Sequence, residues 1–275
     1  MSEPFIPPDL PPARRISREG IDLCYYMFGP ENGHPLVICH GLAAAGIQFA
    51  EDGRFFGEAG YRVLVPDVRG HGQSGRPQKP TPENFGMNVL AEDIMAMMDA
   101  EGMGQADWIG NSMGGVIALE VIRQNPEHIR RLLTFGTTYS LSAPAYLVPF
   151  LPFLYRLIGP KPIAFIGGWA TSKHKPVRRL IRHVLGQFDR EILHPLLINL
   201  REYDYRQTAV EFDRPILMLR GSLDRDINAT LGPTLETMKA KPDFTLIEMP
   251  GAGHCANLDQ PDAFRSAARR FLETE

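Results

Sequence analysis

A serine between glycines, in the segment 110–114 (GNSMG), constrains the fold of this chain more than any other feature. The segment follows an apolar run and precedes a helix-like run. A strand, a sharp turn and a helix in this order lift a serine hydroxyl into an open site. Strand and helix then approach so closely that little more than a hydrogen atom fits as side chain at positions 110 and 114, and both are glycine. The segment predicts that Ser112 is a nucleophile; the alternative is a glycine-rich turn that contains a serine by chance.

Strand-like runs alternate with helix-like runs along most of the chain. Short, apolar, β-branched runs are typical of strands buried on both faces of a parallel sheet. After a first strand at 21–28, such runs are found at 36–39, 62–65, 107–109, 132–135, 216–219 and 244–248. Segments with helical spacing lie between them, for example 88–99 and 261–273. This alternation predicts an α/β protein with a mostly parallel, doubly wound sheet.

The segment 139–210 interrupts the alternation. It begins with a loop-like stretch and an apolar, proline-containing run, and its later part has helical spacing. We expect it to form a helical cap over the carboxyl edge of the sheet, inserted into a core made of 16–138 and 211–275. Residues 1–15 are rich in proline, which fixes φ and disfavours helix at the preceding residue, so we expect an extended arm.

Bulk properties narrow the class of protein further. A chain of 275 residues is long enough for one α/β domain with an insertion. Its net charge of -3 gives no electrostatic reason to expect nucleic acid or an acidic membrane as partner. No apolar run is long enough for an integral membrane segment, and the first residues lack the apolar core of a secretory signal. The three cysteines have no metal-like spacing, which favours a reducing compartment; we expect a cytoplasmic protein without a metal.

A serine hydroxyl becomes a good nucleophile only beside a base, which in turn needs a carboxylate to orient it. His254 lies between the last predicted strand and the last predicted helix and is the candidate base. Asp224, just past the strand at 216–219, is the candidate acid, and Asp226 is the alternative. The other place for an acid in such a fold, the segment 135–139, holds no carboxylate, which favours Asp224.

The developing oxyanion of acyl transfer also needs hydrogen-bond donors. One is expected to be the backbone N–H of Met113, directly after the serine, and the other that of Leu42, in the loop after the first core strand. Gly41 permits a tight turn there. The alternative is that His40 and Gly41 only turn the chain; we expect a structural role for the His40 side chain.

Taken together, these segments resemble the α/β-hydrolase fold superfamily. The resemblance covers nearly the whole chain outside the arm and the cap, and implies a Ser112–Asp224–His254 triad that needs no metal or organic cofactor. It also implies a structural role for 66–74 (PDVRGHGQS). A serine nucleophile, in place of aspartate, speaks against a haloalkane dehalogenase or an epoxide hydrolase. The motifs that carry the resemblance are His40-Gly41, 66–74, the elbow 110–114, Gly221 with Asp224, and Gly253-His254.

The elbow 110–115 is also similar to that of meta-cleavage-product hydrolases, which cut C–C bonds. Those enzymes usually carry a longer glycine-rich oxyanion loop and a tryptophan after the catalytic histidine. Here the loop is 42–46 (LAAAG), and Cys255 follows the histidine. We therefore expect a serine carboxylic-ester hydrolase, carboxylesterase-like; the alternatives are a lactonase or C–C bond hydrolase with the same triad, and a non-catalytic receptor or scaffold.

The expected partner is a small-molecule ester with a hydrophobic part. Leu147, Phe150, Phe153 and Leu154 form an apolar run in the cap and are candidate substrate-binding residues. The alternative is that these side chains only pack the cap on the core or form a subunit contact, as most apolar side chains do.

Overall fold

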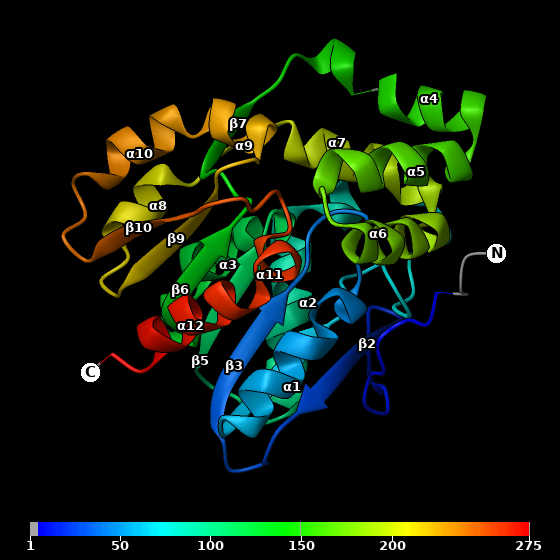
Figure 1. The fold of residues 1–275 in the computed structure, drawn as a ribbon. Coiled ribbons are helices and arrows are strands. Elements are labelled where there is room, and N and C mark those ends of the chain that lie inside the picture. The colour runs from blue at the N-terminus through cyan, green and yellow to red at the C-terminus, as the bar shows by residue number, and fades with distance from the viewer. Residues whose placement is uncertain (1–4, 149, 275) are drawn as a thin grey trace.

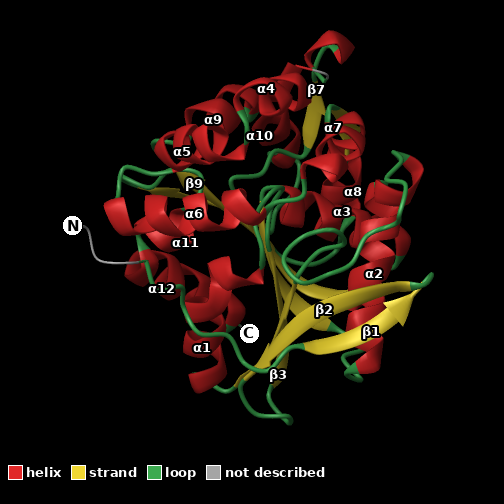
Figure 2. Cartoon of the chain, turned by 90° about the vertical axis from the view of Figure 1, so that its right-hand side faces the viewer, coloured by secondary structure: helices red, strands yellow, loops and turns green. Residues whose placement is uncertain are grey.

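The computed structural model describes residues 5–148 and 150–274, without the side chains of Leu147, Leu151, Tyr155 and Arg156. Its main sheet has eight strands, with helices on both faces (Figures 1 and 2). At one edge of the sheet, β1 pairs antiparallel with β2 and β2 pairs antiparallel with β4; all the other neighbouring pairs are parallel. The predicted α/β class is confirmed. In spatial order the strands are β1 (Arg14–Arg18), β2 (Ile21–Phe28), β4 (Tyr61–Pro66), β3 (His34–Cys39), β5 (Ala106–Asn111), β6 (Ile129–Phe135), β9 (Ile216–Gly221) and β10 (Phe244–Met249).

The sheet is buried on both faces because alternate side chains of each strand enter two different cores. In β3, Val37 and Cys39 belong to one core, and Leu36 and Ile38 belong to the other. The helices divide between the same two faces, as expected for a doubly wound sheet. The first face is covered by α2 (Met87–Ala100), α3 (Met113–Gln124), α8 (Arg206–Glu211) and α10 (Gly232–Met238), and the second by α1 (Ala50–Glu58) and α12 (Pro261–Leu272).

Strand β1 was not expected from the sequence, and it begins inside the predicted arm. It pairs antiparallel with β2, with Ile16 opposite Leu23. Four of its five residues are polar and most are exposed, which is common in an edge strand and leaves no apolar pattern to recognise.

Helices fill most of the segment between β6 and β9. They are α4 (Phe150–Ile158), α5 (Pro160–Thr171), α6 (Lys175–Gln187) and α7 (Leu193–Leu200). A short antiparallel pair, β7 (Ser140–Ser142) and β8 (Glu202–Asp204), joins the two ends of the insertion. The boundary expected at residue 210 falls within α8, which packs on α3 and α10. In Figure 1, α4 to α7 lie beyond the carboxyl ends of the parallel strands. Within the described residues, none of the helices has both the length and the apolar character required to cross a bilayer.

Candidate active site

Ser112 lies at the turn between β5 and α3, with φ of 52° and ψ of −120°. This positive φ is unfavourable for a side chain with a Cβ atom and persists only where the surroundings enforce it. The Ser112 N–H donates to the carbonyl of Phe135 at 3.0 Å. A Cβ atom on Gly114 would lie 2.2 Å from the Cys39 carbonyl oxygen, and one on Gly110 would lie 2.6 Å from the backbone of α3. The glycines are therefore required by the close approach of strand and helix.

His254 and Asp224 are in direct contact. The Nδ1 atom of His254 lies 2.9 Å from Oδ2 of Asp224, which is 7% exposed and directly precedes α9 (Arg225–Thr230). Because an ionised carboxylate only accepts, Nδ1 carries the proton and Nε2 has a free lone pair to act as a base. Asp226, on α9, is exposed. Of the two candidate acids, the structure brings Asp224 to the histidine.

Ser112 and His254 face one small cavity, of about 90 Å³. In the part of the chain that the structure describes, Ser112 Oγ and the His254 imidazole do not form a hydrogen bond with each other. Gly136, at the end of β6, has φ of 57°, and a Cβ atom there would lie 3.0 Å from Cε1 of His254. The missing side chain leaves room for the ring beside the serine.

The loop after β3 passes close to Ser112. A Cβ atom on Gly41 would lie 2.9 Å from Cβ of Ser112. The Ala44 N–H donates to the Gly41 carbonyl at 3.3 Å, and Ala43 between them has φ of 57°, so the loop is a tight turn. Leu42 follows Gly41 in this turn. Met113 is the first residue of α3, where backbone N–H groups have no partner within the helix. The two predicted oxyanion donors are therefore close to Ser112. Met113 follows Ser112 in the sequence, and Leu42 lies in the turn that passes close to it.

Two buried histidines hold this loop in place. Nε2 of His71 accepts from the Ala43 N–H at 3.1 Å, and Nε2 of His40 accepts from the Val68 N–H at 3.0 Å. Nδ1 of each ring lies within hydrogen-bond distance of a backbone carbonyl. Burial lowers the pKa of His40 to about 4 and that of His71 to about 3. Both rings are therefore neutral at pH 7 and accept hydrogen bonds that an imidazolium cannot accept.

Asn111 is a site residue that the sequence reasoning missed. It is 2% exposed, and its Nδ2 donates to the carbonyls of Phe135 and His254 at 3.2 and 3.3 Å. Its Oδ1 accepts from Gln48 at 3.1 Å. This amide fastens the histidine loop to the elbow. The only local signal was a polar residue inside the elbow motif, because its partner His254 lies far along the chain.

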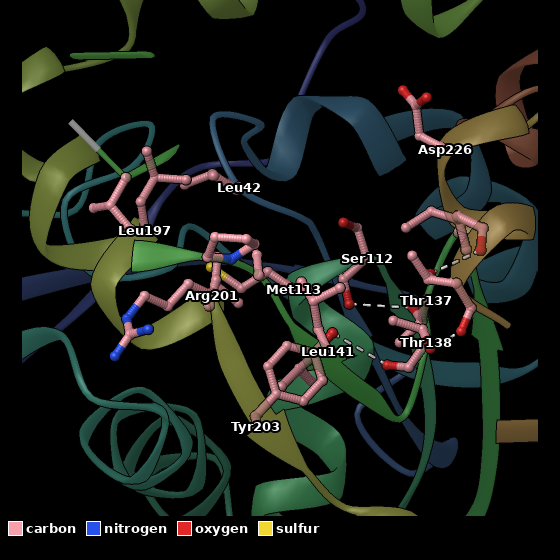
Figure 3. Close-up of a pocket in the computed structure, with 18 residues that line it drawn as sticks. Leu42, Ser112, Met113, Thr137, Thr138, Leu141, Leu197, Arg201, Tyr203 and Asp226 are labelled. Carbon is pink, nitrogen blue, oxygen red and sulfur yellow. Dashed lines mark hydrogen bonds between the residues drawn. The ribbon is translucent and has the colours of Figure 1, made fainter. Parts of the chain in front are cut away.

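A larger cavity, of about 430 Å³, opens on the other side of Ser112 (Figure 3). Thr137 lines this cavity, and its hydroxyl donates a hydrogen bond to the Ser112 carbonyl oxygen at 3.1 Å. The guanidinium of Arg201 is directed away from Ser112 (Figure 3). The lining is mainly apolar, so the cavity suits a hydrophobic group. Its apolar residues include Val116, Leu141, Val148, Leu197, Leu200 and Ile227.

Three of the four candidate substrate residues of the cap lie outside the cavities at Ser112. Phe150 and Phe153 are 62% and 61% exposed and, like Leu154, are not among the described residues that line the two cavities at Ser112. Leu154 lines a separate cavity of about 270 Å³, which reaches Leu42. Leu147 belongs to a short 3-10 helix, and its side chain is outside the described part of the structure.

Metal ligation and thiol chemistry have little support in the described part of the chain. Three or more His, Cys, Asp or Glu side chains do not come together there in a way that could hold a metal ion. The three cysteines are free and buried. Burial raises the pKa of the Cys39 and Cys255 thiols, which opposes formation of a nucleophilic thiolate.

Comparison with known proteins identifies the fold. The model of the alpha/beta hydrolase fold family matches residues 34–155. The solved enol-lactonase from Burkholderia xenovorans LB400 superposes with a TM-score of 0.83 and 24% identity, over 95% of this chain and all of the other (100%). The chain has the α/β-hydrolase fold, as its motifs predicted.

Individual relatives are named for different activities. The 3-oxoadipate enol-lactonase 2 of Acinetobacter baylyi is 24% identical over 265 residues, which are 94% of this chain and 96% of that protein. The bifunctional epoxide hydrolase 2 of Sus scrofa is 28% identical over 129 residues, 47% of this chain. The match spans 22% of the epoxide hydrolase, about a fifth of its length.

Proposed function

We propose that this protein is a serine hydrolase that cleaves carboxylic esters through an acyl-enzyme, with Ser112 as nucleophile, His254 as base and Asp224 as its carboxylate. The observation that carries the proposal is the 2.9 Å contact between His254 Nδ1 and Asp224, with Ser112 on a strained elbow in the same cavity. The match of residues 34–155 to the alpha/beta hydrolase fold family supports the reaction class.

The reaction follows from these positions. Ser112 Oγ attacks the ester carbonyl carbon while His254 Nε2 takes its proton, and Asp224 stabilises the imidazolium. The N–H groups of Leu42 and Met113 donate to the oxyanion of the tetrahedral intermediate. The intermediate collapses, and the alcohol leaves with the proton from His254. Water, deprotonated by His254, then attacks the acyl-enzyme and releases the carboxylic acid. No step requires a metal or an organic cofactor.

The cavities at Ser112 suggest the kind of ester. A space of about 430 Å³ lies within the usual range for small-molecule sites and is lined mainly by apolar side chains. The space on the His254 side is about 90 Å³. We propose a substrate with one bulky hydrophobic part and one small part. A lactone is a cyclic ester and fits the same chemistry, and the similarity to an enol-lactonase over 94% of the chain favours testing lactones early.

The three free, buried cysteines support a reducing compartment, and we propose that the enzyme acts in the cytoplasm.

A substrate panel tests the proposed reaction. Purified protein is assayed with p-nitrophenyl esters of increasing acyl length, with lactones and with ring-cleavage β-diketone analogues. We expect the highest kcat/KM on an ester or lactone, and a burst of p-nitrophenol that matches the enzyme concentration if the acyl-enzyme accumulates. A kcat/KM that is highest for the β-diketone analogues would replace the ester proposal with C–C hydrolysis, and no turnover of any class would favour a binding protein.

A further inference from the structure

The charge of this chain is distributed unevenly. Seven of its 29 lysines and arginines, and none of its 32 aspartates and glutamates, lie in the segment 150–187, which contains α4, α5 and α6. The rest of the chain has 22 cations against 32 anions. The net charge of -3 therefore hides a strongly cationic segment in an otherwise acidic protein.

The same segment and the turn before it expose large apolar side chains. Most side chains of this kind are buried in a water-soluble protein, and a group of exposed ones marks an interaction surface. Helix α4 and the turn before it contribute four, and α5 contributes three, with exposed fractions between 52% and 76%. They are Tyr146, Phe150, Phe153, Leu157, Phe165, Ile166 and Trp169. Figure 1 shows α4 at the outer edge of the molecule.

Two cations of α6 lie against exposed aromatic side chains of α5. The guanidinium of Arg178 stacks 3.5 Å from the ring centroid of Trp169, and that of Arg182 stacks 4.0 Å from that of Phe165. Six described cations of the segment form no ion pair with any carboxylate in the part of the chain that the structure describes. They are Lys161, Lys173, Lys175, Arg178, Arg179 and Arg182. We call these six and the seven apolar side chains the cap patch.

We propose that the cap patch docks on an anionic phospholipid surface, with its aromatic side chains in the headgroup region and its cations against lipid phosphates. Aromatic side chains interleaved with lysine and arginine suit an interface that is apolar below and anionic above. Each cation near an anionic leaflet strengthens binding about five-fold, so the unpaired cations have a large combined effect.

A second copy of the chain fits the patch less well. A two-fold contact through one surface brings the same residues of both copies together. The cap patch would then place its cations against those of the other copy, with no acidic residue in 150–187 to separate them. Like charges facing each other across an interface are costly. An anionic surface supplies the opposite charge.

Cosedimentation with vesicles tests the docking. Wild-type protein is mixed with vesicles of phosphatidylcholine alone and of phosphatidylcholine with phosphatidylglycerol. We expect binding to the anionic vesicles, weakened by added salt, and much weaker binding to the neutral ones. The variant Lys173→Gln/Lys175→Gln/Arg179→Gln should bind the anionic vesicles about 100-fold more weakly. The variant Phe150→Ser/Phe153→Ser should also lose binding, by about ten-fold or more.

Matched controls remove the same charge or the same kind of side chain elsewhere. Lys79→Gln/Lys239→Gln/Arg270→Gln removes three exposed cations outside the patch, and Ile6→Ser/Leu246→Ser removes two exposed apolar side chains outside it. Both should bind like wild type. An unchanged melting temperature shows that each patch variant is folded.

Three results would overturn the proposal. The first is no binding of wild type to anionic vesicles, and the second is equal loss of binding in the patch variants and their controls. The third is a wild-type dimer, seen by size-exclusion chromatography with light scattering, that Phe150→Ser/Phe153→Ser converts to a monomer; the patch would then be covered by a second copy. None of these measurements depends on ester hydrolysis, so the outcome is independent of the proposed reaction.

Discussion

Nδ1 of His254 lies 2.9 Å from the carboxylate of Asp224, whereas Asp226, two residues further on, is exposed. We therefore expect the two carboxylates to respond differently to mutation. Asp224→Asn keeps the shape but removes the charge that stabilises the imidazolium, and kcat should fall by about 10³- to 10⁴-fold. In Asp226→Asn, kcat should stay within about three-fold of wild type, because Asp226 lines the cavity of about 430 Å³ while the carboxylate at Nδ1 of His254 is that of Asp224. The reverse ranking of kcat/KM would assign the acid to Asp226.

Asn111 is expected to act as a positioning residue. Asn111→Ala removes the amide that holds the His254 carbonyl and lets the histidine loop shift, and a displacement of about 1 Å costs of the order of 100-fold in rate. The loss should fall mainly on kcat. Asn199→Ala is the matched control, because Nδ2 of Asn199 also donates to backbone carbonyls, at 2.8 and 3.1 Å, but to those of Pro82 and Phe85 rather than to the histidine loop. An equal loss of activity in both variants would point to a general structural effect.

The cavity of about 430 Å³ should determine which acyl or alcohol groups are accepted. Leu197→Trp fills part of it, so kcat/KM for a hexanoate ester relative to an acetate ester should fall by about ten-fold or more. Phe153→Ala is the comparison, since Phe153 is exposed and is outside the described lining of this cavity. If Phe153→Ala changes the ratio and Leu197→Trp does not, the cap surface rather than this cavity selects the substrate.

The buried histidines should make stability depend on pH. The folded-state pKa of His71, about 3, is below its ordinary value of 6.5, so the unfolded chain takes up a proton that the folded chain does not. Stability is therefore fully present above about pH 6.5 and is lost as the pH falls toward the folded value. His71→Gln keeps an acceptor for the Ala43 N–H but does not titrate. Urea unfolding between about pH 7 and pH 5 should show wild type losing about 2 kcal/mol more than His71→Gln. Parallel losses would show that His71 is protonated in the folded protein.

Much of the fold was predictable because the strands are buried on both faces. Runs such as 36–39 in β3 are apolar for that reason, and this pattern is visible without the structure. The elbow was predictable because its glycines are required by a close approach, 2.2 Å for a Cβ atom on Gly114. Strand β1 was not, because it is a polar edge strand whose place depends on pairing with β2.

The walls of the site were less predictable than its chemistry. Leu141, Leu197 and Ile227 come from three separate segments, and only the folded chain brings them together at Ser112. The apolar run around Phe150 and Phe153 has the composition of a pocket wall, but composition does not tell a wall from an outer surface. The two contacts of Asn111 likewise depend on tertiary structure.

The most direct test of Ser112 as the nucleophile is the hydrolysis of a short p-nitrophenyl ester by Ser112→Ala. We predict that kcat/KM falls by about 10⁴-fold or more with an unchanged melting temperature, and that a fluorophosphonate labels Ser112 in the wild type and nothing in the variant. Activity of Ser112→Ala within about ten-fold of wild type, or fluorophosphonate labelling that peptide mass spectrometry places on another residue, would contradict it.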